Sequence, residues 1–129
     1  MAKYNSFEEL PVWQNAKTLA IVIYEVSSGG RLSKDFSLKD QIRRCVVSIS
    51  SNIAEGSERG TKQEFIQFLY IARGSCGELR SQIHIAEEIG YISHKDSIHI
   101  LNLAQDVSRQ INGFIEYLKK SSLKGQKFR

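Results

Sequence analysis

The sequence predicts an all-α fold, an antiparallel up-down-up-down four-helix bundle. Apolar residues recur at spacings of three and four residues in four separate stretches, which is the pattern of amphipathic helices. Pro11 is the only proline among the 129 residues, so long helices can run without interruption. The stretches are separated by short connections, which make consecutive helices antiparallel neighbours.

The first helix is predicted to begin at Leu10 or Pro11, because proline suits the first helical turn, where its missing N–H would have no partner. The run Ser27-Ser28-Gly29-Gly30 ends it. Its apolar stripe consists of Val12, Ala16, Leu19, Ile23 and Val26. The second helix is predicted from about Leu38 to Ser57, with a stripe of Leu38, Ile42, Cys45 or Val46, Ile49 and Ile53.

The third helix opens with the capping box Thr61-Lys62-Gln63-Glu64. In this motif the threonine hydroxyl accepts the backbone N–H of Glu64, and the glutamate reaches back to the backbone N–H of the threonine. The helix is predicted to run to Ile89, with Gly90 as its C-terminal glycine. The fourth helix opens at Ser93 and keeps its apolar pattern to Leu118.

The charge distribution divides the chain into a bundle domain, residues 1–120, and a basic, flexible C-terminal tail, residues 121–129. Residues 119–129 hold five of the 18 basic residues and no acidic one. The rest of the chain, with 13 basic and 14 acidic residues, therefore carries a net charge of −1. The net charge of +4 thus indicates a basic tail rather than a broad nucleic-acid-binding face.

No sequence feature indicates catalysis. The motifs G-x-S-x-G, H-E-x-x-H and G-x-x-x-x-G-K-[ST] are absent. The histidines are His84, His94 and His99, and the last two do not share a helical face as residues four apart would. We therefore expect no enzymatic activity, no metal or other cofactor, and no small-molecule substrate.

Cysteine use and hydropathy favour a cytoplasmic protein without a membrane role. Cys45 and Cys76 lie in predicted helices among apolar neighbours, which indicates buried, reduced thiols. The longest apolar run, Leu19 to Ile23, is too short to cross a bilayer, and the first residues lack the apolar stretch of a signal peptide.

An unusual polar stripe accompanies the apolar one on the second helix. Ser48, Asn52 and Glu55 are spaced by four and three residues, and Ser75 and Glu78 offer a matching set on the third helix. Arg44 could supply the counter-charge for Glu55 or Glu78. One interpretation is a polar network that fixes helix register. The alternative, that these residues form a ligand or RNA contact surface, stays open.

The same residues resemble one bacterial family, the four-helix bundle proteins named after the 23S ribosomal RNA intervening sequences that encode them. The accessory variability protein of diversity-generating retroelements looks like a relative. The resemblance covers about residues 7–91, and Ser50 stands where many members would have proline. It is carried by Phe7-x-x-Leu10-x-Val12-Trp13, Leu38-x-x-Gln41-Ile42-Arg43-Arg44, Ser48-Ile49-x-x-Asn52-Ile53-Ala54-Glu55-Gly56, and Phe65-x-x-Phe68-Leu69-x-Ile71-Ala72-x-Gly74-Ser75-x-x-Glu78-Leu79.

The resemblance implies a ring-like homopentamer without enzymatic activity, associated with structured RNA or with an RNA-handling partner such as a reverse transcriptase. Two hypotheses follow. In the first, the protein is an oligomeric scaffold that binds RNA through its tail and through Lys39, Arg43, Arg44, Arg59 and Lys62.

In the second hypothesis, the protein is an interaction scaffold with no nucleic-acid role of its own. Helix 10–27 carries more apolar residues than one bundle core can accept, so a second buried face is expected at a subunit interface. The residues predicted for this interface are Trp13, Ile21 and Tyr24.

Overall fold

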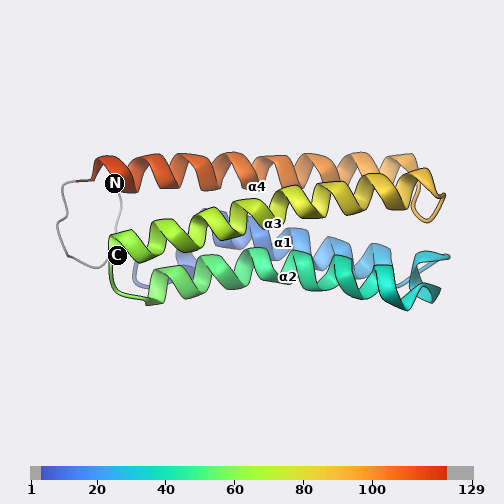
Figure 1. Cartoon of the computed structure of the whole chain (residues 1–129), viewed down its shortest axis with the longest axis horizontal. Helices are drawn as coiled ribbons and strands as arrows, with labels where there is room; N and C mark the ends of the chain where they lie inside the picture. The colour runs from blue at the N-terminus through green and yellow to red at the C-terminus, as the bar shows by residue number, and fades with distance from the viewer. Residues whose placement is uncertain (1–3, 122–129) are drawn as a thin grey trace.

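The computed structural model describes residues 4–121, which form a bundle of four long helices. The helices are α1 (Pro11–Ser27), α2 (Phe36–Glu58), α3 (Lys62–Glu88) and α4 (His94–Lys120), and the short 3-10 helices η1 (Phe7–Glu9) and η2 (Leu32–Lys34) precede α1 and α2. Each long helix packs antiparallel to the next, and α1 also packs on α4, which closes the bundle (Figure 1). The predicted fold class is confirmed.

Local signals place the ends of α1 where the sequence predicted. The helix begins at Pro11 and ends at Ser27, with Ser28 as the C-cap residue. Gly30 follows with a φ of +61°, a left-handed conformation that suits glycine. The connection then passes through η2 before it reaches α2.

Helix α2 begins two residues before the predicted start. The side chain of Asp35 caps it by accepting the backbone N–H of Leu38 at 3.0 Å. This cap was missed because Phe36 and Ser37 precede the first residue of the apolar stripe.

The predicted cap begins α3, and α4 begins with a hydroxyl cap at its predicted start. The Thr61 hydroxyl accepts the N–H of Glu64 at 3.1 Å, and the Ser93 hydroxyl accepts the N–H of Asp96 at 3.0 Å. One detail of the capping box differs, because the Glu64 carboxylate accepts the Thr61 hydroxyl at 2.9 Å rather than the backbone N–H of Thr61. Gly90 has a φ of +80° and ends α3 as expected.

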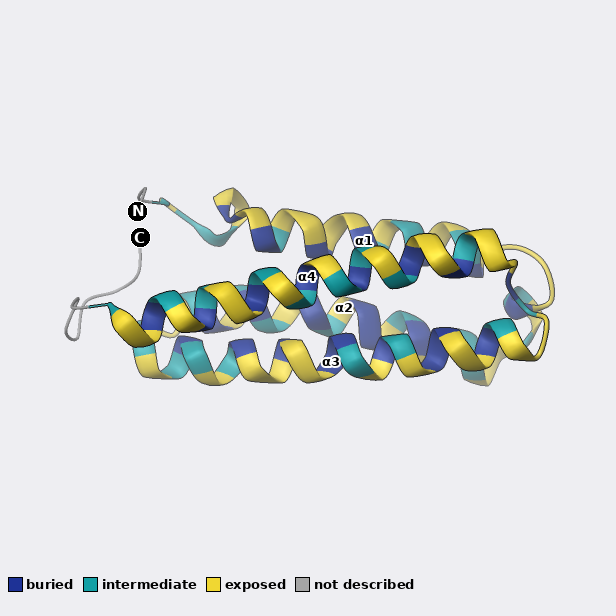
Figure 2. Cartoon of the chain, turned by 90° about the horizontal axis from the view of Figure 1, so that it is seen from above, coloured by how far each residue is buried: buried dark blue, intermediate teal, exposed yellow. Residues whose placement is uncertain are grey.

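The apolar stripes of the four helices meet along the axis of the bundle and form one continuous core (Figure 2). Gly56 of α2 is buried against α3. A Cβ atom at this position would lie 2.7 Å from the Cβ of Phe68 on α3. Glycine therefore allows α2 and α3 to pack closely near the connection that joins them.

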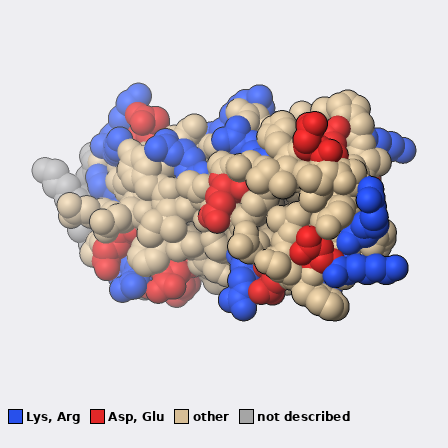
Figure 3. All heavy atoms as spheres, turned by 45° about the vertical axis from the view of Figure 1, so that its right-hand side comes forward, with Lys and Arg blue, Asp and Glu red and all other residues tan. Residues whose placement is uncertain are grey.

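The surface mixes charges of both signs. In the view of Figure 3, lysine and arginine alternate with aspartate and glutamate, and that view shows no face of a single sign. Helix α4 ends at Lys120, so all of the predicted tail except Ser121 lies outside the described residues. Within residues 4–121, no helix combines the length and the apolar character needed to span a membrane.

Candidate functional site

The five basic residues predicted to contact RNA do not form one patch. They lie along α2 and at the start of α3. Lys39 and Arg59 are 20 residues apart, which corresponds to roughly 30 Å at 1.5 Å per helical residue, so they lie at opposite ends of the bundle.

Near the start of α2, Lys39 contacts the connection between α1 and α2, and Arg43 contacts the end of α1. The Lys39 Nζ donates to the carbonyl of Ser33 at 3.1 Å. The Arg43 guanidinium donates to the hydroxyls of Ser27 at 2.8 Å and Ser28 at 3.0 Å, and it lies 4.4 Å from the ring centroid of Tyr24. A cation at a helix C-terminus also interacts favourably with the helix dipole. These contacts give Arg43 a structural role at the end of α1.

The remaining three basic residues also have partners within the chain. Arg44 pairs with Asp40 at 2.9 Å, which raises the pKa of the guanidinium through the hydrogen bond and the charge of Asp40. Arg59 pairs with Glu55 at 3.3 Å, and Lys62 donates to the carbonyl of Ser121 at 2.9 Å. The Arg44 and Arg59 pairs are exposed, so the two guanidinium groups can still contact a ligand.

The packing of α2 on α3 brings together three members of the predicted polar network. The hydroxyls of Ser48 and Ser75 lie 2.6 Å apart across the two helices. Asn52 donates from its side-chain nitrogen to the carbonyl of Ser48 at 2.7 Å. The Cys45 thiol donates to the carbonyl of Ser75 at 3.2 Å. The bonds of Cys45 and Ser48 thus join α2 to α3, and the bond of Asn52 lies within α2.

Arg44 does not serve as the counter-charge for Glu55 or Glu78, contrary to our expectation. Its partner is Asp40 on the preceding turn of α2, and the partner of Glu55 is Arg59 on the next turn. Residues four apart on one helix are close neighbours, so these exposed pairs form without reaching across to α3. Glu78 is exposed, and its charge helps to raise the pKa of the Cys45 thiol.

An apolar groove lies on the outer side of α1 and α2. Ile21 is 52% exposed, Tyr24 is 42% exposed, and Val47 of α2 is 39% exposed. The groove itself is lined by Lys17, Ala20, Ile21, Tyr24, Glu25, Ser28 and Ser50. We call Ile21, Tyr24 and Val47, with this groove, the α1–α2 face. The contribution of α2 was missed because Val47 and Ser50 lie outside its apolar stripe, and nothing in the sequence shows that they lie beside α1.

Trp13 belongs partly to the core rather than wholly to an exposed face. Its side chain is half-buried, and its ring packs edge-on against Phe7 with the centroids 5.1 Å apart. The Lys17 Nζ lies 5.2 Å from the centroid of the Trp13 ring. A substitution of Trp13 would therefore change packing as well as any interface, and Ile21 is a cleaner probe of the α1–α2 face.

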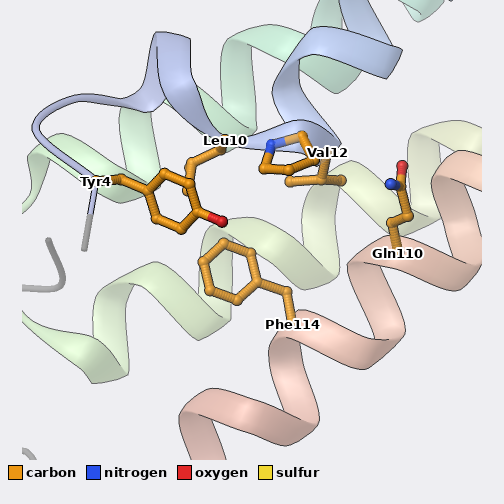
Figure 4. A pocket seen from close by; sticks show the side chains of 6 residues that line it. Tyr4, Leu10, Val12, Gln110 and Phe114 are labelled. Carbon is orange, nitrogen blue, oxygen red and sulfur yellow. The ribbon is translucent and has the colours of Figure 1, made fainter. Parts of the chain in front are cut away.

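A small pocket of about 200 Å³ lies between the start of α1 and α4. Figure 4 shows the rings of Tyr4 and Phe114 close to one another beside Leu10 and Val12, with Gln110 at the side. The Gln110 side-chain oxygen accepts the Asn15 amide at 2.8 Å. The lining is mainly apolar, and its polar side chains are one phenol and one amide, so the arrangement favours apolar contact over acid–base chemistry.

Two further groups of chemically active side chains show no arrangement for catalysis. Burial raises the pKa of the Cys45 and Cys76 thiols to about 12, which keeps both protonated and poorly nucleophilic. Within residues 4–121, no three side chains of the metal-ligating types gather where they could hold a metal ion.

Comparison with known proteins gives the family of this chain. The model of the family described as 23S rRNA-intervening sequence protein matches residues 8–113 of this chain. The chain belongs to this family. The comparison with curated proteins gives no match.

A solved structure shares the fold. It is the crystal structure of a protein of unknown function from the S23 ribosomal protein family of Bacteroides thetaiotaomicron VPI-5482. The two chains align with a TM-score of 0.74 and 23% sequence identity, over 81% of this chain and 98% of the other. At this identity the likeness shows the fold alone.

Proposed function

We propose that this protein is a non-enzymatic scaffold that self-associates through the α1–α2 face, as a ring-like homopentamer. The observation that carries the proposal is the exposure of Ile21 and Tyr24 in one apolar groove, with Val47 exposed on α2. Complete burial of an apolar side chain contributes about 1.5–3 kcal/mol, so three half-exposed side chains can supply part of the free energy of an interface. The homopentamer is what the resemblance to the family implied.

The proposal is tested by measuring mass in solution over a range of micromolar concentrations by light scattering. The wild-type protein should form an oligomer, and Ile21→Asp should dissociate it because a carboxylate would have to be buried at the interface. Ile98→Asp is the matched control, since Ile98 is a similarly exposed isoleucine on α4. A monomeric wild-type protein, or equal weakening by both variants, would contradict the proposal.

Association with structured RNA is a second candidate function, favoured by a cluster of cations that the sequence analysis missed. Arg73 of α3 and Lys119 of α4 lie 4.8 Å and 5.4 Å from the centroid of the exposed Tyr70 ring. The Lys119 ammonium donates a hydrogen bond to the Tyr70 hydroxyl, and this bond raises the pKa of Lys119. Cations beside an aromatic ring suit a nucleic-acid strand.

The RNA hypothesis is tested by titrating a structured RNA with full-length protein at two salt concentrations. Arg73→Gln with Lys119→Gln should weaken binding and reduce its salt dependence, because phosphate contacts release counterions. The matched variant carries Lys124, Lys127 and Arg129 replaced by glutamine in the tail. If only the tail variant loses affinity, binding is a non-specific property of the tail, and if the wild type does not bind, the protein acts through protein contacts alone.

A further inference from the structure

The pocket between the start of α1 and α4 has room for one more aromatic ring. Its volume is about 200 Å³, and its lining is mainly apolar (Figure 4). An apolar protein cavity of about 150 Å³ is large enough to bind benzene. Phe114 already packs edge-on against Phe65, with the ring centroids 5.1 Å apart, and a further ring beside Phe114 would gain a contact of the same kind. The pocket therefore suits a phenyl side chain.

Acidic residues border this pocket. A neighbouring hollow shares Tyr4 and Leu10 with it and is also lined by Glu58, the last residue of α2. Among the described residues that line the two hollows, Glu58 is the only charged one. Glu8 and Glu9 are exposed on η1, directly before Leu10. A segment that enters here should therefore combine an aromatic side chain with positive charge. We call Glu8, Glu9 and Glu58 the acidic edge.

The tail of this chain has the chemistry that the pocket and the acidic edge require. Residues 122–129 read Ser-Leu-Lys-Gly-Gln-Lys-Phe-Arg and lie outside the described residues. They contain three basic residues and no acidic one. Their single aromatic residue, Phe128, stands between Lys127 and Arg129. One segment thus carries the ring and the positive charges side by side.

The position of Ser121 decides which tail residue can reach the pocket. Its carbonyl accepts the Lys62 Nζ at 2.9 Å, so the tail begins beside the start of α3. Phe114 lies seven residues before Ser121, which is about 10 Å along α4. Two residues of extended chain cover about 7 Å and seven cover about 24 Å. The backbone can therefore carry Phe128 to the pocket, but it leaves Leu123 short of it.

We propose that residues 122–129 fold back along α4 of their own chain and place the Phe128 ring in this pocket. Lys127 and Arg129 then lie beside the acidic edge. The contact is made within one protomer, so the inference depends neither on self-association nor on RNA binding. It also restricts the tail, which the charge distribution alone predicted to be flexible.

The test follows the methyl signals of Leu10 and Val12 by NMR in the full-length protein. A phenyl ring in the pocket shifts the signals of the methyl groups beside it, so Phe128→Ala should move both sets of signals. Leu123→Ala is the matched control, because it removes an apolar tail side chain that does not reach the pocket, and it should leave the signals in place. In the wild type, the ring protons of Phe128 should show nuclear Overhauser effects to the Val12 methyl groups.

The contribution of charge is measured with the same signals. Added salt should move the wild-type signals toward those of Phe128→Ala, because salt screens the attraction between the tail and the acidic edge. Glu58→Gln should move them in the same direction. Glu88→Gln is the matched control, since Glu88 is an exposed glutamate at the far end of α3, and it should have no effect.

Three outcomes would overturn the inference. Signals that stay in place in Phe128→Ala would show that the pocket does not hold the Phe128 ring. Equal shifts in Leu123→Ala and Phe128→Ala would show that Phe128 is not the anchor. Nuclear Overhauser effects between labelled and unlabelled chains, in a mixture of isotope-labelled and unlabelled wild type, would place the tail in the pocket of another copy.

Discussion

Gly56 is the clearest single-residue determinant of the close packing between α2 and α3. The resemblance to the family gave this glycine as the last residue of Asn52-Ile53-Ala54-Glu55-Gly56, but the sequence offered no physical reason for it. The structure supplies one, because an added Cβ atom would lie 2.7 Å from the Cβ of Phe68. A Cβ atom cannot move aside as the end of a flexible side chain could, so the two helices would have to separate.

We therefore expect Gly56→Ala to lower the free energy of unfolding by about 1–3 kcal/mol, the usual cost of overpacking a core. Gly74→Ala is the matched control on α3. It should raise the free energy of unfolding by about 0.5–1 kcal/mol, because alanine is the better helix former and the site is open. Urea denaturation measures both, and equal effects of the two substitutions would show that the close approach at Gly56 has no energetic importance.

Glu87 connects the end of α3 to the start of α4. Its carboxylate accepts the His94 Nδ1 at 2.7 Å. The hydroxyl of Ser97 is buried and lies close enough to this carboxylate to lower its pKa, although it falls outside strict hydrogen-bond geometry. Ser97 first, and then His94, hold the pKa of Glu87 below its ordinary value of 4.5.

This shift predicts a pH dependence of stability. A carboxyl group with a lower pKa in the folded state stabilises the protein above pH 4.5, and the stabilisation is lost as the pH falls through the folded-state pKa. Glu87→Gln should therefore be less stable than the wild type at pH 6, and the difference should shrink below pH 4.5. Thermal unfolding across this range measures it, with Glu88→Gln as the neighbouring control. A difference that does not change with pH would contradict the assignment.

At the scale of elements, local signals explain why the helices begin and end where they do. The hydroxyl cap at Thr61 was predicted and is confirmed, and the Ser93 hydroxyl caps α4 where that helix was predicted to open. The Asp35 cap was not predicted, and its carboxylate has a second partner, since the Tyr91 hydroxyl donates to it at 3.1 Å. This hydrogen bond is the largest cause of the raised pKa of Tyr91. Asp35 thus joins the start of α2 to the connection between α3 and α4.

We expect Asp35→Ala to lower the free energy of unfolding by about 1–2 kcal/mol, through the lost N-cap and the lost tyrosine contact. Tyr91→Phe removes only the second contact and should cost about 0.5–1.5 kcal/mol. The double variant should lose less free energy of unfolding than the sum of the two single losses, since both substitutions remove the same hydrogen bond. If Asp35→Ala costs no more than Tyr91→Phe, the cap contributes nothing measurable.

Arg43 shows that a basic residue on a surface helix can have a structural role. A surface arginine on α2 was predicted to contact RNA, and the structure places it over the last turn of α1, with bonds to Ser27 and Ser28. The apolar spacing identified the helix but carried no information about which side chains of α1 lie opposite. Only the packing of α1 on α2 decided the partners of Arg43.

At the scale of the whole molecule, the contact of α1 with α4 closes the bundle and joins residues distant in the sequence. The Asn15 side-chain amide donates to the side-chain oxygen of Gln110, which lies 95 residues further along the chain. The pocket between Tyr4 and Phe114 lies beside this contact. Trp13, the only tryptophan, lies at the same end with Phe7 against its ring. Its fluorescence therefore reports the closure of the bundle.

We expect unfolding in urea to be a single transition, with the same midpoint by Trp13 fluorescence and by helical circular dichroism, since one core joins the four helices. If the protein self-associates, that midpoint should rise with protein concentration for the wild type and stay constant for Ile21→Asp. A fluorescence change that precedes the loss of helix would mean that α1 detaches before the other helices unfold.

The sequence by itself determined the four helices, most of their ends and the antiparallel order, because apolar spacing, caps and short connections act over a few residues. The tertiary structure alone decided which side chains meet across helices: Ser48 with Ser75, Arg43 with the end of α1, Arg73 and Lys119 with Tyr70. It also decided that Ile21 and Tyr24 of α1 line one groove with Ser50 of α2. These properties depend on the rotation and register of each helix in the bundle, which residues distant along the chain set together.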